Sequence, residues 1–452
     1  MIEANMKDIH TAYFVGIGGI GMSAIARFLN RRDVKVHGYD LTKTPLTEQL
    51  EAEGMTIHYE EDLTKIPDRV DLVVFTPAVP SEHKELQYFR SKGYPVKKRA
   101  EVLGMISKEK LTIGVAGTHG KTTTTSVLTH ILRTGGVDCS AFLGGIAGNF
   151  ESNYVHGGGE WVVVEADEFD RSFLHLHPEL AILTSMDADH LDIYGDPNSV
   201  TAGFNGFASQ VKRKIFHKEG LTVKTAAETE DYGIERGSCK AVNVHVANGC
   251  MVFDYHSPKG IIKDIEYTHP GLHNVENAVG AISIAKTLGV SNTDIKKALA
   301  SFKGIKRRFE IIARTEHIVY IDDYAHHPEE LKAAIAAART FYPGQRLTGI
   351  FQPHLFSRTR DFADGFAEAL DLLDEPVLIP IYPARELPIT GVTSKMVFDK
   401  MVNPNKRLMS REEATDFYSS EKGLNGVEVL MTLGAGNIDQ LVPKIKKAVI
   451  SV

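Results

Sequence analysis

The residues best suited to chemistry in this chain form one glycine-rich stretch, AGTHGKTTTT, at 116–125. Gly117 and Gly120 allow backbone N–H groups to turn toward an anion, and Lys121 adds a positive charge. Thr122 is placed to offer its hydroxyl group to Mg²⁺. The β-branched run that begins at Leu111 predicts a strand before this loop, and we expect a helix to start after the loop. The stretch therefore predicts a phosphate-binding site.

The match to the G-x-x-x-x-G-K-[ST] phosphate loop is incomplete. Its first glycine would fall at position 115, which is Val115, whereas Gly114 lies one residue early. A glycine-rich turn that leads into an ordinary helix is therefore the alternative interpretation.

Two acidic clusters follow predicted strands further along the chain. The apolar run 161–164 ends in Glu165-Ala-Asp-Glu, and the run 180–184 is followed by DADHLD at 187–192. Mg²⁺ prefers hard oxygen ligands and commonly takes only one or two from protein. Thr122 and Glu165 meet that need, although Glu165 could also cap a helix. His190 is a less favoured magnesium ligand, and it could instead orient a phosphate or a substrate carboxylate.

A second glycine motif lies near the N-terminus. The run AYFVGIGGIG at 12–21 predicts a strand followed by a G-x-G-x-x-G turn and a helix. Asp40 follows the next predicted strand, as in dinucleotide-binding folds. This pattern predicts a nucleotide diphosphate on the loop with Asp40 near its ribose or base. A tight turn without a ligand is the alternative. A further strand at 71–76 ends at Thr76, where ligands of open α/β sheets bind.

Polar residues follow three predicted strands in the C-terminal third, at 317–321, 347–351 and 427–433. Arg358 is the best candidate for binding a carboxylate, because a planar guanidinium matches that anion. Tyr324 and His326 could bind a polar ligand or simply complete a core. Asn274 and Asn277 lie near the start of a predicted helix, where they could bind an adenine edge or act as caps.

Alternating strands and helices predict an α/β fold with mostly parallel sheets. The 452 residues carry 51 basic and 58 acidic side chains without a basic block, which argues against nucleic-acid binding. No apolar run approaches the length of a membrane span. Three scattered cysteines indicate neither a disulfide framework nor a zinc site. We therefore expect a cytoplasmic protein.

Several motifs together resemble the Mur ligase family over essentially the whole chain. They are GIGGIGMSAIA from Gly16, AGTHGKTTT from Ala116, EADE from Glu165, HNVENA from His273, FKGIKRRFE from Phe302, DDYAHHP from Asp322, FQPHLFSRTRDF from Phe351 and GAGNI from Gly434. Within the family, Tyr324 and the FQPH stretch resemble the members that add L-alanine to UDP-N-acetylmuramate. A member that reattaches recycled peptide to the same sugar is the alternative.

The resemblance implies three domains: a Rossmann-like UDP-sugar-binding domain at 1–108, a P-loop-type ATPase domain at 109–308 and a Rossmann-like amino-acid-binding domain at 309–452. It also implies that ATP and Mg²⁺ activate the lactyl carboxylate as an acyl phosphate, which L-alanine then attacks. Lys121, Glu165 and His190 are the implied catalytic residues, and the metal residues are Thr122, Glu165 and His190. ATP binding is implied for Gly117, Thr118, His119, Gly120, Lys121, Thr122, Thr123, Asn274 and Asn277. UDP-sugar binding is implied for Gly18, Gly19, Ile20, Asp40 and Thr76, and amino-acid binding for Tyr324, His326 and Arg358.

Leu355 departs from the family pattern, because some members carry a second arginine there. One carboxylate contact is therefore expected to be missing or supplied by Arg360 or Arg385. Two other classes remain open on the residues alone: an NAD(P)-dependent dehydrogenase built on the N-terminal glycines, and a non-catalytic nucleotide-binding switch. The oligomeric state is expected to be a monomer or a homodimer.

Overall fold

The computed structural model describes residues 6–187, 194, 196–247, 249–384 and 386–451. The chain forms two compact units. One unit comprises the residues up to Asn243 together with Phe253–Ile265 and Glu276–Phe302, and the other comprises Val244–Val252, Glu266–Val275 and the residues from Lys303 onward. The boundaries expected for three domains remain a prediction.

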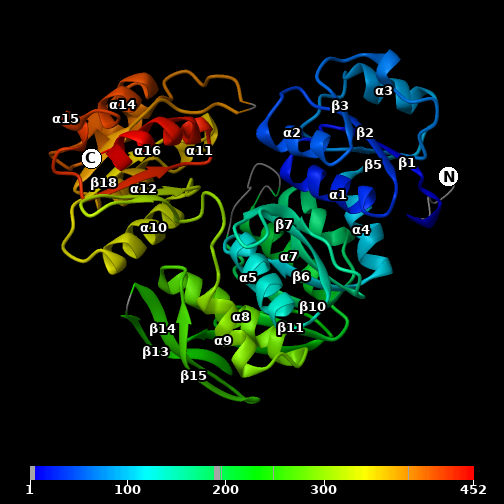
Figure 1. The fold of residues 1–452 in the computed structure, drawn as a ribbon, viewed down its shortest axis with the longest axis horizontal. Helices are drawn as coiled ribbons and strands as arrows, with labels where there is room; N and C mark the ends of the chain where they lie inside the picture. Colours follow the sequence, from blue (N-terminus) through cyan, green and yellow to red (C-terminus); the bar gives the residue numbers. More distant parts are fainter. Residues whose placement is uncertain (1–5, 188–193, 195, 248, 385, 452) are drawn as a thin grey trace. The chain divides into compact units, whose positions relative to one another are not determined.

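The first β-sheet of the described chain has the order β3-β2-β1-β4-β5, and all its pairs are parallel (Figure 1). Its strands are β1 (Thr11–Val15), β2 (Lys35–Tyr39), β3 (Thr56–His58), β4 (Leu72–Phe75) and β5 (Val96–Lys98). The accompanying helices are α1 (Ile20–Asn30), α2 (Pro45–Ala52), α3 (Lys84–Ser91) and α4 (Arg99–Glu109), with 3₁₀ turns η1 (Met6–Asp8) and η2 (Leu63–Lys65).

Alternation along β1 explains why both faces of this sheet are covered. Ala12 and Phe14 belong to one buried cluster, whereas Tyr13 and Val15 belong to another. Successive side chains of a strand point to opposite faces, so a strand that is apolar throughout must be buried on both sides. The predicted Rossmann-like arrangement is confirmed.

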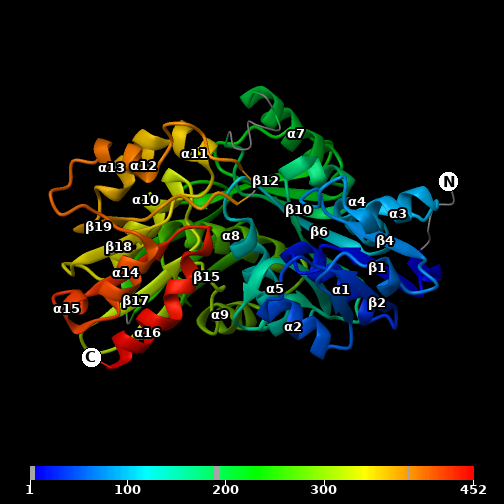
Figure 2. The same cartoon turned by 90° about the horizontal axis from the view of Figure 1, so that it is seen from above.

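The second sheet has the order β15-β14-β13-β12-β11-β10-β6-β9-β7-β8. Its strands are β6 (Leu111–Ala116), β7 (Cys139–Ala147), β8 (Ser152–Val155), β9 (Trp161–Ala166), β10 (Pro178–Leu183), β11 (Lys214–Lys218), β12 (Glu228–Ile234), β13 (Cys239–Ala247), β14 (Cys250–Ser257) and β15 (Gly260–Tyr267). The accompanying helices are α5 (Lys121–Thr134), α7 (Pro197–Ser209), α8 (Leu272–Thr287) and α9 (Asn292–Ala300), with η3 (Phe169–His175). Figure 2 shows α5 beside β6 from a second direction.

The position of β6 matters for function. It pairs in parallel with β9 on one side and β10 on the other, so the carboxyl ends of these strands share one edge of the sheet. The phosphate loop and the residues after β9 and β10 therefore meet there, as predicted. The mixed, alternating residues from 211 to about 267 predict an antiparallel edge or an insertion. The antiparallel direction is wrong for β11, β12 and the start of β13, which pair in parallel.

The third sheet has the order β16-β17-β21-β18-β19-β20 and is parallel except for the β16–β17 pair. Its strands are β16 (Glu310–Arg314), β17 (Val319–Asp323), β18 (Leu347–Phe351), β19 (Glu375–Leu378), β20 (Arg407–Leu408) and β21 (Val429–Leu433). The helices are α10 (Pro328–Phe341), α11 (Phe356–Asp361), α12 (Ala363–Leu370), α13 (Ser394–Lys400), α14 (Arg411–Tyr418), α15 (Glu421–Leu424) and α16 (Val442–Ser451), with η4 (Asn437–Leu441).

Two buried clusters lie on opposite faces of the third sheet. Ile321 packs in the cluster that includes Leu331 and Ile335 of α10, and its neighbour Tyr320 packs in the cluster that includes Ile445 of α16. The predicted α/β class with mostly parallel sheets is therefore confirmed in each part of the chain. No helix among the described residues is long and apolar enough to cross a membrane.

Candidate active site

The phosphate loop joins β6 to α5 through two glycines in unusual conformations. Gly117 has φ = 140° and Gly120 has φ = 80°, and α5 begins directly after Gly120 at Lys121. An L-residue in the left-handed region is strained, so glycine is favoured at both positions. Val115, which departs from the expected motif, is a buried residue of β6. The loop is therefore built as the sequence predicted, despite the missing first glycine.

Close neighbours add a second constraint on these glycines. A Cβ atom at Gly117 would lie 2.0 Å from Thr184 Oγ1, and a Cβ atom at Gly120 would lie 2.6 Å from Asn277 Oδ1. Thr184 follows β10, and its hydroxyl donates a hydrogen bond to the Ala116 carbonyl (3.2 Å). The structure thus brings Asn277 to the loop, as expected for an ATP-binding residue.

Gly117→Ala is expected to lower the free energy of unfolding by about 3 kcal/mol or more, through a strained φ and a clash with Thr184. Gly136→Ala is the matched control, because Gly136 also has positive φ (78°) but no neighbour within 4 Å of a new Cβ. We expect it to cost only about 1 kcal/mol. Urea unfolding of both variants measures the difference. Equal costs would show that the close approach of Thr184 is unimportant.

Lys121 is mostly buried and lies among hydrogen-bond acceptors. Its Nζ donates to the carbonyls of Gly117 (2.7 Å) and Thr118 (3.3 Å), and it forms an ion pair with Glu168 Oε2 at 2.7 Å. Burial lowers the pKa of Lys121, but the carboxylates of Glu168, Asp167 and Glu165 outweigh it and raise the pKa overall. The ammonium is therefore held in its charged form at the start of α5, where a phosphate would also be attracted.

Thr122 and Glu165 form the pair expected of a magnesium site. The Thr122 hydroxyl donates to Glu165 Oε1 (3.0 Å), and the Gly144 N–H donates to Glu165 Oε2 (2.9 Å). A hydroxyl and a carboxylate next to a phosphate loop are the hard oxygen ligands that Mg²⁺ prefers. These two residues therefore fit the metal, with phosphate oxygens and water left to complete its shell. Thr123 follows in α5 and is buried.

His190, expected at the metal or reaction centre, lies outside the described residues. Among the described part of the chain, no group of three or more His, Cys, Asp or Glu side chains is arranged to hold a metal ion. The preceding segment does contact the phosphate loop. The Thr118 hydroxyl donates to the Asp187 carbonyl (2.9 Å), and the His119 N–H donates to Ser185 Oγ (2.9 Å).

The N-terminal glycine loop holds the predicted acid by its own backbone. The Gly18 N–H donates to Asp40 Oδ2 (2.7 Å), and the Thr42 N–H donates to Asp40 Oδ1 (3.2 Å). A Cβ atom at Gly16 would lie 3.2 Å from Thr76 Cγ2, so Thr76 also lies against this loop. The structure therefore brings the loop, Asp40 and Thr76 together.

Gly19 and Ile20 are exposed where α1 begins. They can therefore meet a ligand from solvent.

Arg99 is a residue that the sequence analysis missed. Its Nη2 donates to Asp167 Oδ2 (3.2 Å), and its Nη1 lies 2.5 Å from the position of a Cβ atom on Gly21. Arg99 thus connects the N-terminal glycine loop to the acidic turn after β9. Arg99 lies in a polar, lysine-rich stretch, so no local sequence pattern indicated that it contacts the site. The contact depends on residues far apart in the chain.

Tyr324, His326 and His354 lie together in the second unit. The rings of Tyr324 and His326 are 5.3 Å apart, and those of His326 and His354 are 6.0 Å apart. Burial lowers the pKa of His326 to about 4; Glu330 opposes this shift, whereas the nearby charge of Arg358 adds to it. The predicted amino-acid residues therefore form one group with a neutral imidazole.

His326 should also make stability depend on pH. Its pKa is about 4 in the folded protein and near 6.5 when unfolded. The unfolded state therefore binds the proton first, so the contribution is complete above pH 6.5 and is lost as the pH falls toward 4. Between pH 7 and pH 5, the stability deficit of His326→Asn relative to wild type should shrink by up to about 2 kcal/mol. Urea unfolding at both pH values measures this deficit, and a constant deficit would contradict the shift.

Two acidic residues at the end of β17 support this group. Asp323 accepts hydrogen bonds from the Phe309 N–H (2.6 Å) and the Ala325 N–H (2.7 Å), and burial raises its pKa to about 6. Asp322 accepts from Arg307 Nε (3.2 Å). The guanidinium of Arg307 lies over the Tyr324 ring, 5.1 Å from its centre. These contacts fix the backbone on both sides of Tyr324.

The structure also bears on two further expectations, for Asn274 and for the arginine that could replace the missing contact at Leu355. The Asn274 side chain lies in the second unit, where it donates to the Pro270 carbonyl, so it fastens the start of α8. Arg360 is half exposed and pairs with Asp361 (2.7 Å). This pairing makes Arg360 a weaker candidate for the carboxylate contact that Leu355 lacks. Arg385 lies outside the described residues.

Three family models match the chain in succession. They are "Mur ligase family, catalytic domain" at residues 11–111, "Mur ligase middle domain" at 115–285 and "Mur ligase, glutamate ligase domain" at 307–436.

Relatives align over nearly the full chain. The UDP-N-acetylmuramate–L-alanine ligase of Flavobacterium johnsoniae is 49% identical, with 98% of each chain covered. The same-named protein of Porphyromonas gingivalis is 47% identical, over 96% of this chain and 98% of that one.

Solved structures give the same picture. The UDP-N-acetylmuramate–alanine ligase of Thermotoga maritima superposes with a TM-score of 0.83 at 27% identity, covering 98% of this chain and 99% of that one. A murein peptide ligase from Psychrobacter arcticus has a TM-score of 0.71 at 23% identity, with 98% and 99% covered. The similarity to the Psychrobacter arcticus protein shows a shared fold and nothing more.

Proposed function

Since the chain belongs to the Mur ligase family, we propose that it catalyses the ATP-dependent joining of L-alanine to the lactyl carboxylate of UDP-N-acetylmuramate. The products are ADP, phosphate and UDP-N-acetylmuramoyl-L-alanine, a precursor of peptidoglycan. Relatives of this name and nearly half identical sequence over the whole chain support the proposal.

One observation carries the chemistry: a protonated Lys121 and the Thr122–Glu165 pair meet at the phosphate loop. Transfer of the γ-phosphate requires charge to be neutralised between two anions and an attacking oxygen to be held in line. Lys121 binds the β- and γ-phosphate oxygens in this proposal, exchanging its bond with Glu168 for one with the nucleotide. Gly117–Thr123 bind the phosphates through their N–H and hydroxyl groups.

We assign the metal site to Thr122, Glu165 and His190. When bound, Mg²⁺ neutralises phosphate charge and orients the transferring group. Glu165 is fastened by the Gly144 N–H, so its second oxygen stays directed at Thr122. Asn277, next to Gly120, and Asn274 are assigned to adenine.

The amino-acid step is assigned to the second unit. Arg358 binds the alanine carboxylate through two parallel hydrogen bonds. The neutral imidazole of His326 can accept a hydrogen bond from the ammonium or amine, which a protonated imidazole could not do. Tyr324, held beneath two arginine side chains, closes the other side of this group. The amine displaces phosphate from the acyl phosphate.

The N-terminal loop is assigned to UDP-N-acetylmuramate through Gly18, Gly19, Ile20, Asp40 and Thr76. We also propose the boundaries 1–108, 109–308 and 309–452 for the UDP-sugar, ATP and amino-acid domains. The three family models match in the same order along the chain, at 11–111, 115–285 and 307–436.

An isotope experiment tests the acyl phosphate. UDP-N-acetylmuramate labelled with ¹⁸O in its lactyl carboxylate is incubated with ATP, Mg²⁺ and L-alanine, and the phosphate is analysed by ³¹P NMR. One ¹⁸O atom is expected in each released phosphate, with ADP as the nucleotide product. Release of AMP, or phosphate without ¹⁸O, would contradict the mechanism. The family match does not favour a dehydrogenase, and its ligase models leave no support for a non-catalytic switch.

A further inference from the structure

A cavity of about 480 Å³ lies in the second unit, at the edge of the sheet formed by β19 and β20. Its wall comes from the start of α11, the residues after β19, the start of α13 and the segment that links β20 to α14. Volumes of about 300 to 1,000 Å³ are usual for small-molecule sites. The ligase assignment uses none of the side chains that line this cavity.

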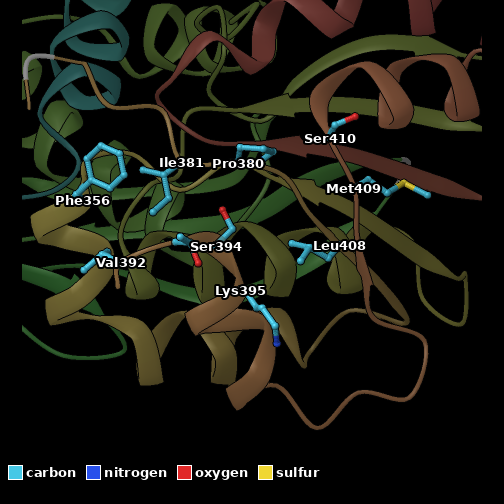
Figure 3. Close-up of a pocket in the computed structure, with 10 residues that line it drawn as sticks. Phe356, Pro380, Ile381, Val392, Ser394, Lys395, Leu408, Met409 and Ser410 are labelled. Carbon is cyan, nitrogen blue, oxygen red and sulfur yellow. The ribbon is translucent and has the colours of Figure 1, made fainter. Parts of the chain in front are cut away.

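The cavity lining is mainly apolar. Phe356, Ile381 and Val392 gather on one side of it, and Leu408 and Met409 lie on the other (Figure 3). Such a wall favours an apolar ligand. An aromatic ring is well suited, because it offers a large contact area and loses little conformational entropy on binding.

Polar groups at the cavity are few and mostly engaged. The Ser394 hydroxyl donates to the Ile379 carbonyl (2.6 Å), and the Ser410 hydroxyl accepts from the Glu413 N–H (3.1 Å). Among the described residues that line the cavity, Lys395 is the only charged one, and it pairs with Asp399 (2.5 Å) with most of its side chain exposed. An ion bound against these apolar side chains would lose part of its hydration without gaining a counter-ion from the described lining, so we expect a neutral occupant.

The wall of the cavity is connected directly to the segment that carries Arg358. The Leu355 N–H donates to the Tyr382 carbonyl (3.0 Å), and the Tyr382 N–H donates to the Pro353 carbonyl (2.9 Å). Phe356 is both a lining residue and the first residue of α11. Leu355 has φ = 72°, an uncommon value for a leucine, so the surrounding structure must hold the backbone at the start of α11 in this conformation. A shift of Phe356 or Ile381 would therefore move the backbone next to His354 and Arg358.

We propose that this cavity is a binding site for a small neutral aromatic molecule, and that its occupancy changes amino-acid binding through α11. The first part depends only on the cavity, whereas the second rests on the proposed function. By thermodynamic linkage, the factor by which the aromatic molecule changes alanine affinity must equal the factor by which alanine changes the affinity of that molecule.

Indole is the probe for the first part, and saturation-transfer NMR with the full chain gives its dissociation constant. Leu408→Trp should weaken indole binding at least tenfold by filling the cavity. The position tolerates change, because Leu408 is 44% exposed in a two-residue edge strand. Val402→Trp is the matched control, at an 84% exposed position outside the lining, and should leave binding unchanged.

A second variant, Leu408→Lys, should also weaken indole binding at least tenfold, and circular dichroism checks that each variant is folded. Absence of indole binding to the wild type, or equal binding to folded Leu408→Trp, would overturn the site.

Steady-state kinetics test the second part. Saturating indole should change the KM for L-alanine at least threefold and leave the KM for ATP unchanged, and the effect should disappear in Leu408→Trp. Indole binding without a change in the alanine KM would overturn the coupling. A chain without alanine-dependent turnover would instead refute the proposed function, and the NMR measurement would still decide the binding site.

Discussion

Lys121→Ala is expected to reduce kcat/KM for ATP on the order of 10³-fold, because loss of one positioned donor to a developing negative charge typically has this effect. The variant also leaves Glu168 buried without its ammonium partner, at a position where the Glu168 side chain is only 3% exposed. Lys121→Arg should recover little, because a larger planar guanidinium would replace the compact ammonium that contacts the Gly117 and Thr118 carbonyls.

Phosphate release and ATP binding measure the effect of these Lys121 variants. Lys108→Ala, at an exposed position in the last turn of α4, is the control and should keep wild-type activity. Substantial turnover by Lys121→Ala would remove the residue from the reaction centre. Comparison with Glu168→Gln separates the two contributions: a loss confined to Lys121→Ala assigns the effect to phosphate contact, whereas similar losses assign it to the buried ion pair.

Arg358→Ala should raise the KM for L-alanine on the order of 10²-fold, since truncating one partner of a paired carboxylate contact costs about 2 to 5 kcal/mol. The KM for ATP should stay near its wild-type value, because the phosphate loop lies in the other unit. Arg358→Lys should recover only a small part, because an ammonium cannot form the two parallel hydrogen bonds of a guanidinium.

Arg360→Ala is a closely matched control for Arg358. Arg360 lies two residues further along the same helix, but it is exposed and already paired with Asp361. Its removal should change the KM for alanine less than twofold. An unchanged alanine KM in Arg358→Ala, or a large effect in Arg360→Ala, would transfer the carboxylate contact to another residue.

Sequence reasoning succeeded where a short pattern defines both conformation and chemistry. The two glycines before Lys121 adopt positive φ, a helix begins at Lys121, and an apolar run directly precedes Glu165. These features predict the meeting of Thr122 and Glu165, because β6 and β9 are neighbours with parallel carboxyl ends. The alternation of strand and helix likewise predicts the α/β class.

Other features depend on contacts between distant residues, which no local pattern encodes. The salt bridge of Lys121 with Glu168 and the bridge from Arg99 to Asp167 belong to this kind. The predicted strand direction after residue 211 was wrong for a related reason. Alternation of residues predicts a half-exposed strand, but it does not predict whether the adjacent strand of the sheet runs parallel or antiparallel. Asn277 lies next to Gly120, a contact that its position in the sequence alone could not show.

The nucleophile is the central claim, and a phosphate-release assay tests it most directly. The enzyme is supplied with UDP-N-acetylmuramate, ATP and Mg²⁺, and then with L-alanine, glycine, L-serine or the tripeptide L-alanyl-γ-D-glutamyl-meso-diaminopimelate. We predict the highest kcat/KM with L-alanine and no turnover with the tripeptide. Glycine should be discriminated by only about 1 to 3 kcal/mol, as expected for one missing methyl group. Turnover with the tripeptide but not with L-alanine would contradict the account and make the chain a peptide-recycling ligase.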